Sequence, residues 1–255
     1  MNPQTVISFY KFTPIEDVSC FRDELFNKVK ALGTKGTILL ASEGLNGMVS
    51  GSSDAIERLK TYLTSISFLS DLEFKDSYYQ GVTFRRMLVK VKKEIITIRQ
   101  PVVPYEETGP YIEPLELKKK LDAGENITLL DTRNTYEVEM GTFEGAIDPR
   151  IDSFSEFTTY VDDNLEELKK KPVVTFCTGG IRCEKATAYM MKKGISNLYQ
   201  LKGGILKYFE ETMLLESDNH WQGDCVVFDK RKAITPKLKP SDKLICYVCL
   251  KEMEL

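Results

Sequence analysis

The sequence predicts an α/β protein of two domains, an antiparallel sheet with helices on one face followed by a parallel α/β domain. Three observations support this prediction. The chain has 255 residues, which is enough for two domains that each bury a core. Its first part alternates β-rich runs with helical segments in the order βαββαβ, whereas its second part alternates buried apolar strands with helices. Between them, residues 99–114 hold four prolines and show little periodicity, which is typical of a linker.

The first domain is expected to span residues 1–98. Strands are predicted at 6–12, 37–41, 47–51, 73–79 and 87–98, and helices at 15–32 and 54–63. This order suits a small antiparallel sheet with both helices on one face. Asn46-Gly47, between two of the strands, is a strong signal for a hairpin turn. A group of basic residues is either a solvated strand face or a contact for RNA: Arg85, Arg86, Lys90, Lys92 and Lys93.

The second domain is expected at residues 115–215. Helices are predicted at 115–123, 154–168 and 184–193, and strands at 127–130, 173–176 and 198–201. Strands that alternate with helices indicate a parallel sheet, and ligands of such sheets bind beyond the carboxyl ends of the strands. Cys177 immediately follows one of these strands, so its position is that of an active site.

Composition excludes several classes of function. With 35 Lys and Arg against 38 Asp and Glu, the net charge of −3 provides no overall attraction to nucleic acid or to an anionic membrane. The apolar runs are too short to span a bilayer, and the start of the chain does not resemble an export signal, so we expect a soluble, cytoplasmic protein. The six cysteines are expected to be thiols. His220 is the single histidine, so a nucleophile must be activated without a Cys/His or Ser/His pair.

The best candidate for a nucleophile is Cys177, which opens the loop Cys177-Thr178-Gly179-Gly180-Ile181-Arg182 between a strand and a helix. Two adjacent glycines let the backbone curl so that several N–H groups point inward. These amides, the helix N-terminus and the Arg182 guanidinium all favour a thiolate, so we expect a lowered pKa for Cys177.

The same loop is open to three other interpretations. Cysteine phosphatases generally have five residues between cysteine and arginine, whereas four separate Cys177 from Arg182, and this tighter loop better suits one sulfur atom carried as a persulfide. The loop by itself therefore favours a sulfurtransferase over a phosphatase. The third interpretation is a buried strand-end cysteine beside an ordinary glycine turn.

The segment Phe-Cys-Thr-Gly-Gly-Ile-Arg-Cys-Glu-Lys-Ala at 176–186 resembles the signature of the rhodanese-domain tRNA uridine(34) hydroxylase family. Further stretches agree with it at 42–47 (Ser-Glu-Gly-Leu-Asn-Gly), 131–137, 141–146 and 223–231. The resemblance implies a ferredoxin-like, acylphosphatase-like first domain, a rhodanese domain and a catalytic role for Cys177. It also implies tRNA as the partner and an oxygen-dependent 5-hydroxylation of the wobble uridine.

No cofactor motif accompanies this resemblance, so molecular oxygen is the expected co-substrate and no bound cofactor is predicted. No membrane and no obligate protein partner are expected either. Cys183 is either a second catalytic thiol that resolves an oxidised or persulfidated Cys177, or a packed helix residue. Arg182 is expected to act as a cation and hydrogen-bond donor, to the loop or to an RNA phosphate. Asp131 and Arg133 are expected to form a buried structural ion pair.

The C-terminal extension, residues 216–255, is basic and contains Trp221 and Phe228, which suit either an RNA contact with base stacking or a solvated tail. Cys246 and Cys249 have the spacing of half a zinc site, but only Cys225 and His220 are near in sequence, so no metal site is predicted. The alternatives to the hydroxylase are a sulfurtransferase working through a Cys177 persulfide and a non-enzymatic module that senses oxidation or binds RNA.

Overall fold

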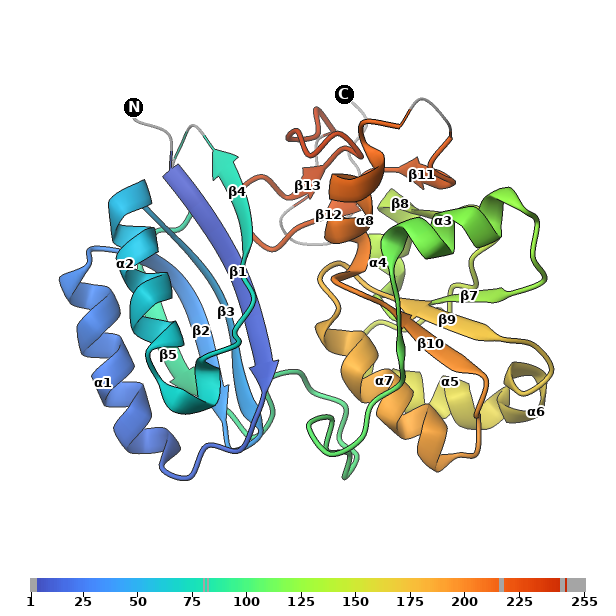
Figure 1. Ribbon diagram of the computed structural model, residues 1–255, viewed down its shortest axis with the longest axis horizontal. Helices are drawn as coiled ribbons and strands as arrows, with labels where there is room; N and C mark the ends of the chain where they lie inside the picture. Colours follow the sequence, from blue (N-terminus) through green and yellow to red (C-terminus); the bar gives the residue numbers. More distant parts are fainter. Residues whose placement is uncertain (1–3, 80, 82, 216–217, 244–245, 247–255) are drawn as a thin grey trace. The chain divides into compact units, whose positions relative to one another are not determined.

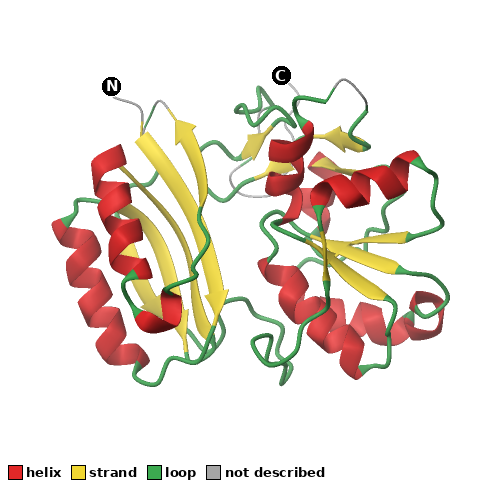
Figure 2. Cartoon of the chain, in the orientation of Figure 1, coloured by secondary structure: helices red, strands yellow, loops and turns green. Residues whose placement is uncertain are grey.

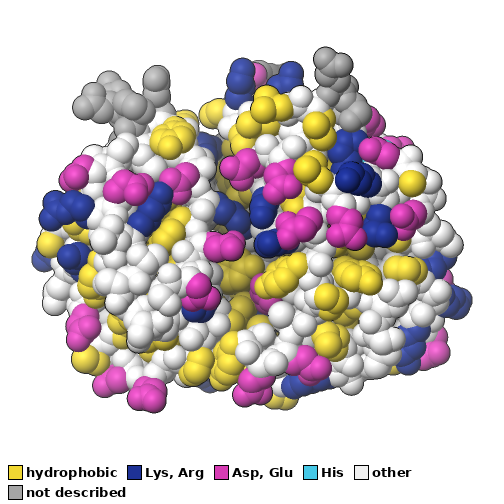
Figure 3. Space-filling model, viewed as in Figure 1, with side chains coloured by type: hydrophobic (Ala, Val, Ile, Leu, Met, Phe, Trp, Pro, Cys, Tyr) yellow, Lys and Arg dark blue, Asp and Glu magenta, His cyan; other side chains and the backbone are white. Residues whose placement is uncertain are grey.

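The computed structural model describes residues 4–79, 81, 83–215, 218–243 and 246 (Figure 1). The chain divides into two compact units, with the boundary between Ile96 and Thr97. None of the helices within the described residues is long and apolar enough to cross a membrane. On the face seen in Figure 3, acidic and basic side chains intermingle, as expected from the nearly balanced charge.

The first unit is a five-stranded sheet in the order β4-β1-β3-β2-β5, covered on one face by two helices (Figure 1). Its neighbouring strands are antiparallel except β2 and β5, which are parallel. This is the predicted ferredoxin-like arrangement with one added edge strand. Its elements are β1 (Gln4–Phe12), α1 (Val18–Ala31), β2 (Lys35–Ala41), β3 (Gly44–Gly51), α2 (Ser53–Thr64), a 3₁₀ turn (Ser67–Leu69), β4 (Lys75–Tyr79) and β5 (Met87–Val91).

Local chemistry explains where the helices of this unit begin. Asp17 accepts a hydrogen bond from the Cys20 N–H at the start of α1, and Ser52 accepts one from the Ala55 N–H at the start of α2. Each helix then presents an apolar stripe to the sheet. The resulting core includes Ile7, Phe9, Leu25, Ile38, Val49 and Leu59.

The hairpin turn lies four residues earlier than predicted. Ala41 pairs with Gly44, so Ser42 and Glu43 form the turn, and Asn46 and Gly47 lie within β3. The prediction that Asn46-Gly47 makes the turn was therefore wrong. Packing explains the glycine, because a Cβ at Gly47 would lie 2.5 Å from the ring of Phe9 on β1.

The second unit contains a four-stranded parallel sheet in the order β6-β10-β9-β7, with helices on both faces (Figure 2). This confirms the predicted parallel α/β domain. The strands are β6 (Tyr111–Ile112), β7 (Thr128–Asp131), β9 (Val173–Phe176) and β10 (Leu198–Leu201). The helices are α3 (Pro114–Asp122), α4 (Thr135–Met140), α5 (Phe157–Asp163), α6 (Leu165–Leu168), α7 (Ile181–Lys192) and α8 (Gly204–Thr212).

The C-terminal extension contains one strand that pairs with the rest of this unit and one hairpin of its own. β8 (Gly141–Phe143) pairs with β11 (Trp221–Gly223), and β12 (Cys225–Val226) pairs with β13 (Ala233–Ile234). β12 also packs against α4 (Figure 1). The helix predicted over 154–168 is divided into a 3₁₀ turn (Phe154–Glu156) followed by α5 and α6.

Part of the segment expected to be a linker, residues 99–114, is fastened to the second unit. β6 forms the edge of its sheet, beside β10. Just before it, the Gly109 N–H donates to Thr187 Oγ1 over 2.9 Å, and the Gln200 amide donates to the Gly109 carbonyl over 2.7 Å. An edge strand of two residues between prolines has no detectable period, so the sequence did not indicate it.

Candidate active site

Cys177 lies directly after β9, in a loop that ends where α7 begins at Ile181. Its side chain is fully buried, and the Gly180 N–H donates a hydrogen bond to Cys177 Sγ over 3.1 Å. Gly180 has a φ of +102°, in the left-handed region that glycine adopts without steric cost. The loop thus curls around the sulfur at the carboxyl edge of the parallel sheet, where the sequence places it.

The start of α8 holds the outer side of this loop. The Ile205 N–H donates to the Cys177 carbonyl over 2.9 Å, and the Leu206 N–H donates to the Thr178 carbonyl over 3.1 Å. Gly204 has a φ of +66°, and a Cβ there would lie 2.4 Å from the Cys177 carbonyl oxygen. Because α8 engages the carbonyl groups, the loop can turn its N–H groups toward the sulfur. The sequence signal for this support is the glycine pair Gly203-Gly204 after β10, which sequence analysis missed.

Cys177 and Cys183 form a buried pair of unequal thiols. Burial alone raises the pKa of Cys177, but a hydrogen bond with the Cys183 thiol, the charge of Arg182 and backbone hydrogen bonds lower it well below its usual range. Cys183 is also fully buried, and burial together with the neighbouring Cys177 raises its pKa well above the usual range. Of the two thiols, Cys177 is therefore the one that ionises more readily, and Cys183 is the one that keeps its proton to higher pH. Thr132 Oγ1 lies 3.7 Å from Cys183 Sγ and helps to fix it.

The guanidinium of Arg182 is engaged by a carboxylate of its own chain. Its two terminal nitrogens donate to Glu137 over 2.6 and 2.8 Å, and both side chains are buried. Burial raises the pKa of Glu137, but the charge and hydrogen bonds of Arg182 outweigh it, so the pKa lies below its usual value. Arg182 was expected to donate either to the loop or to an RNA phosphate. Its guanidinium faces the loop, since it also lies 3.5 Å from Thr178 Oγ1.

Glu137 was not assigned a role from the sequence. It is the third residue of α4, a short helix that begins with a capping box at Asn134. The capping box already accounts for a glutamate at this position. The sequence pattern therefore does not indicate the second contact of Glu137, with Arg182 on a different helix.

Asp131 and Arg133 form the predicted buried ion pair. Both side chains are fully buried, and Arg133 Nη2 donates to Asp131 Oδ2 over 2.6 Å and to the Gly141 carbonyl over 2.6 Å. The structural interpretation of this pair is confirmed. Arg133 Nη1 also donates to the Glu137 carbonyl over 3.3 Å, so this ion pair adjoins the one between Arg182 and Glu137, and the two pairs bring two positive and two negative buried charges together.

The C-terminal extension reaches the same loop through Cys225 and Phe228. Cys225 is fully buried, and burial raises its pKa to about 12 in spite of the opposing charge of Arg133 and a hydrogen bond with Thr178. It is therefore an inert thiol at neutral pH. The Phe228 ring is 56% exposed, and its centroid lies 6.0 Å from Arg182 Cζ.

Trp221, in contrast, is not available to RNA. Its side chain is only 7% exposed, and it packs edge-to-face against Phe143 and Phe209 and over the guanidinium of Arg133. The suggestion that Trp221 stacks on a base was wrong, because β11 brings the indole into the core of the second unit.

In the first unit, the stretch Ser42 to Gly47 holds the loop that follows β5, because β5 ends at Val91 and not at Ile98 as predicted. Glu43 Oε1 accepts a hydrogen bond from the Ile95 N–H over 2.7 Å, and the Asn46 amide donates to the Ile95 carbonyl over 3.2 Å. Both side chains thus have a structural use. The basic residues near β5 that were considered for RNA contact are all exposed: Arg85, Arg86, Lys90, Lys92 and Lys93.

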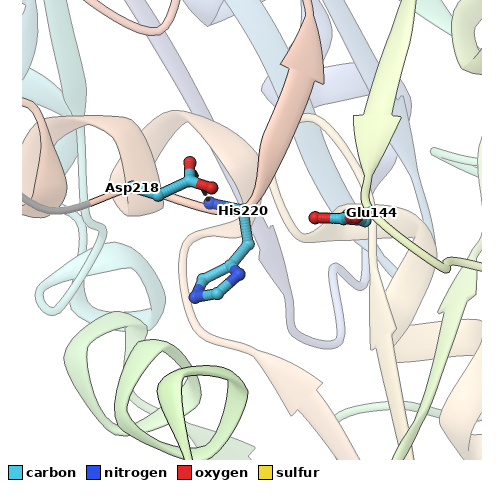
Figure 4. A group of neighbouring side chains, drawn as sticks. All are labelled: Glu144, Asp218 and His220. Carbon is cyan, nitrogen blue, oxygen red and sulfur yellow. Dashed lines mark hydrogen bonds between the residues drawn. The ribbon is translucent and has the colours of Figure 1, made fainter. Parts of the chain in front are cut away.

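One group of side chains within the described residues has the composition of a cation site. Potential ligand atoms of Glu144, Asp218 and His220 lie within 4.8 Å of one another (Figure 4). His220 Nε2 already lies 2.7 Å from Asp122 Oδ1, and both Glu144 and Asp218 are exposed, so we assign no metal to this group. Cys249, half of the Cys-x-x-Cys pair, lies outside the described residues.

The unequal thiol pair predicts a specific pH dependence. The thiolate absorbance of Cys177 is measured as the difference in ultraviolet absorbance between the wild type and Cys177→Ser. We expect this difference to titrate at a lower pH than a free cysteine does. Cys183→Ala should raise this pKa, because it removes a hydrogen bond to the thiolate. An unchanged titration in Cys183→Ala would contradict the pairing.

The lowered pKa of Cys177 also makes the stability of the fold depend on pH. The pKa of Cys177 is lower in the folded chain than in the unfolded one, so its contribution to stability is present above the unfolded pKa and is lost as the pH falls through the folded pKa. The free energy of unfolding of the wild type, relative to Cys177→Ser, should therefore increase from neutral to alkaline pH.

Each unit matches the model of a known domain family. Residues 4–95 match the model of the UPF0176 acylphosphatase like domain, and residues 113–211 match that of the rhodanese-like domain. A solved rhodanese-like domain from Anabaena sp. is 22% identical, with a TM-score of 0.37, and the match covers 45% of this chain and 79% of that one.

Curated relatives match nearly the whole chain. A protein of Cupriavidus metallidurans named tRNA uridine(34) hydroxylase is 43% identical over 249 residues, which cover 95% of this chain and 87% of that protein. A protein of Cupriavidus necator with the same name is 44% identical at the same coverage. Since the match includes both units, the chain belongs to the tRNA uridine(34) hydroxylase family.

Proposed function

We propose that this protein hydroxylates uridine 34 of tRNA at C5, with molecular oxygen as co-substrate and Cys177 as the reacting group. The observation that carries the activity is the identity of 43 to 44% with proteins named tRNA uridine(34) hydroxylase, over 95% of the chain. The observation that supports Cys177 is its place in a loop of backbone donors, beside Cys183, the thiol with the higher pKa.

The chemistry of the product indicates what the cysteine pair has to supply. Replacing C5–H by C5–OH with dioxygen puts one oxygen atom on the base and leaves the other to be reduced to water. That reduction takes two electrons and two protons. Cys177 and Cys183 provide the two electrons when they are oxidised to a disulfide, the Cys183 thiol provides one proton, and solvent provides the other. One uridine, one dioxygen, one thiolate, one thiol and one proton give one 5-hydroxyuridine, one disulfide and one water. A cellular thiol then restores the pair.

The sulfurtransferase is the alternative with a specific observation in its favour, because the loop is compact and suited to one extra sulfur atom on Cys177. In that case Cys177 would carry a persulfide from a donor such as thiosulfate to an acceptor thiol. The family of the chain favours the hydroxylase.

Mass spectrometry of nucleosides tests the two functions against each other. In cells that lack this protein, we expect 5-hydroxyuridine derivatives in total tRNA to fall and to return when the wild-type gene is supplied. In parallel, purified protein is assayed for turnover of thiosulfate. Unchanged 5-hydroxyuridine in the deletion strain, together with rapid thiosulfate turnover, would refute the hydroxylase in favour of the sulfurtransferase.

A further inference from the structure

The segment that follows β12 places an exposed aromatic ring at the rim of the active-site loop. Phe228 is 56% exposed, whereas the residues before it, Val226 and Val227, are 6% and 4% exposed. Single exposed apolar residues are common on protein surfaces and need no explanation by themselves. Phe228 differs because its ring lies over Arg182, and Arg182 in turn acts on Cys177 and contacts Thr178.

The backbone that carries Phe228 is held firmly. The Val227 N–H donates to the Lys232 carbonyl over 2.7 Å, and the Lys232 N–H donates to the Asp229 carbonyl over 3.1 Å. Inside this turn, Arg231 forms an ion pair with Asp229 in which both side chains are almost completely buried. A turn fixed in this way presents its aromatic ring without the entropic cost of ordering a mobile loop.

The same hairpin is anchored on the helix that carries Glu137. Val226 and Ala233 pack with Met140 of α4 in a small apolar cluster, and Cys225 contacts Thr178 of the loop. The extension and the catalytic loop therefore share one rigid frame. Exposed lysines, Lys230, Lys237 and Lys239, occur in the same segment and are suited to the phosphates that flank a base.

From this placement we propose that Phe228 is a substrate-binding residue on which the target uracil stacks, so that the base lies beside Arg182, next to the loop that holds Cys177. The proposal rests on the proposed function, because it takes uridine 34 as the base. Stacking of a base on an aromatic side chain tolerates any base, so Phe228 would hold the uracil and leave its identity to other contacts.

Kinetics with an anticodon stem-loop RNA test the proposal. Phe228→Leu should raise KM about 5- to 100-fold and leave kcat nearly unchanged, because a stacking contact stabilises the bound substrate and the transition state alike. Phe228→Trp keeps an aromatic face and should retain the wild-type KM. Tyr105→Leu, which removes a ring that is 43% exposed elsewhere in the second unit, is the matched control and should have no effect.

A binding comparison separates this proposal from the proposed function. In the Cys177→Ser background, dissociation constants are measured for the stem-loop with uridine 34 and for one with an abasic position 34. Phe228→Leu should weaken the binding of the first RNA and not of the second. Equal losses for both RNAs, or no loss for either, would overturn the stacking role. A wild type that binds as expected but forms no 5-hydroxyuridine would instead contradict the proposed function.

Discussion

Cys177→Ser should reduce the formation of 5-hydroxyuridine at least about a thousandfold while the protein remains folded. A serine hydroxyl stays protonated where the cysteine is a thiolate, and it cannot be oxidised to a disulfide. The measurement is mass spectrometry of nucleosides after incubation of purified protein with tRNA, dioxygen and a thiol reductant. Cys20→Ser, at an exposed cysteine of the first unit, is the matched control and should retain full activity.

Cys183→Ser then tests whether the two sulfurs act together. Serine keeps a hydrogen-bond donor to Cys177 but cannot form the disulfide, so repeated turnover should fail even though the thiolate persists. In the wild type without added reductant, one disulfide should appear for each 5-hydroxyuridine formed. Product without any disulfide would show that the electrons come from elsewhere.

Glu137→Gln should destabilise the second unit by about 3 to 5 kcal/mol, since it leaves the buried Arg182 guanidinium without a counter-charge. Trp221 is the only tryptophan of the chain and is buried in that unit, so its fluorescence during denaturant unfolding reports the loss directly. A double variant, Glu137→Gln with Arg182→Met, removes the isolated charge and should recover part of the stability. Glu167→Gln, at an exposed ion pair with Lys170, should change little.

The effect of Glu137 should depend on pH with a definite sign. Its pKa is lower in the folded chain than in the unfolded one, so its contribution is fully present above the unfolded pKa and is lost as the pH falls through the lowered value. The difference in stability between the wild type and Glu137→Gln should therefore narrow in acid. A difference that is constant with pH would mean that the glutamate acts through packing and not through its charge.

The central part of the site could be predicted from the sequence because its residues are consecutive in the chain. The bounds of β9 and β10 agree with the predicted strands, and the cysteine, the glycines and the helix start follow one another in the chain. The residues that contact the loop from distant parts of the sequence could not be predicted in this way. Glu137 and Arg182 are 45 residues apart, and Gly204 supports Cys177 from another helix. Such contacts depend on how the elements pack, which periodicity does not specify.

Long-range packing also explains the two errors. Asn46-Gly47 has the composition of a turn, but the glycine makes room for Phe9 on a strand far away in sequence. Trp221 and Phe228 are alike as aromatic residues in a basic segment, yet β11 buries the first and the turn after β12 exposes the second. Composition could not distinguish them, because burial is decided by the pairing of β11 with β8.

The balance of buried charge around the loop has a consequence for the choice of ligand. Asp131 and Glu137 together cancel the charges of Arg133 and Arg182, so these four side chains give the Cys177 loop no surplus positive charge. When the Cys177 sulfur is ionised it adds one negative charge, and the Gly180 N–H donates to it. A phosphate dianion at the loop would have to compete with Glu137 for the Arg182 guanidinium. The ion pair of Glu137 and Arg182, which stabilises this unit, thus also opposes the binding of a dianion at the loop, whereas a neutral base does not compete for the guanidinium.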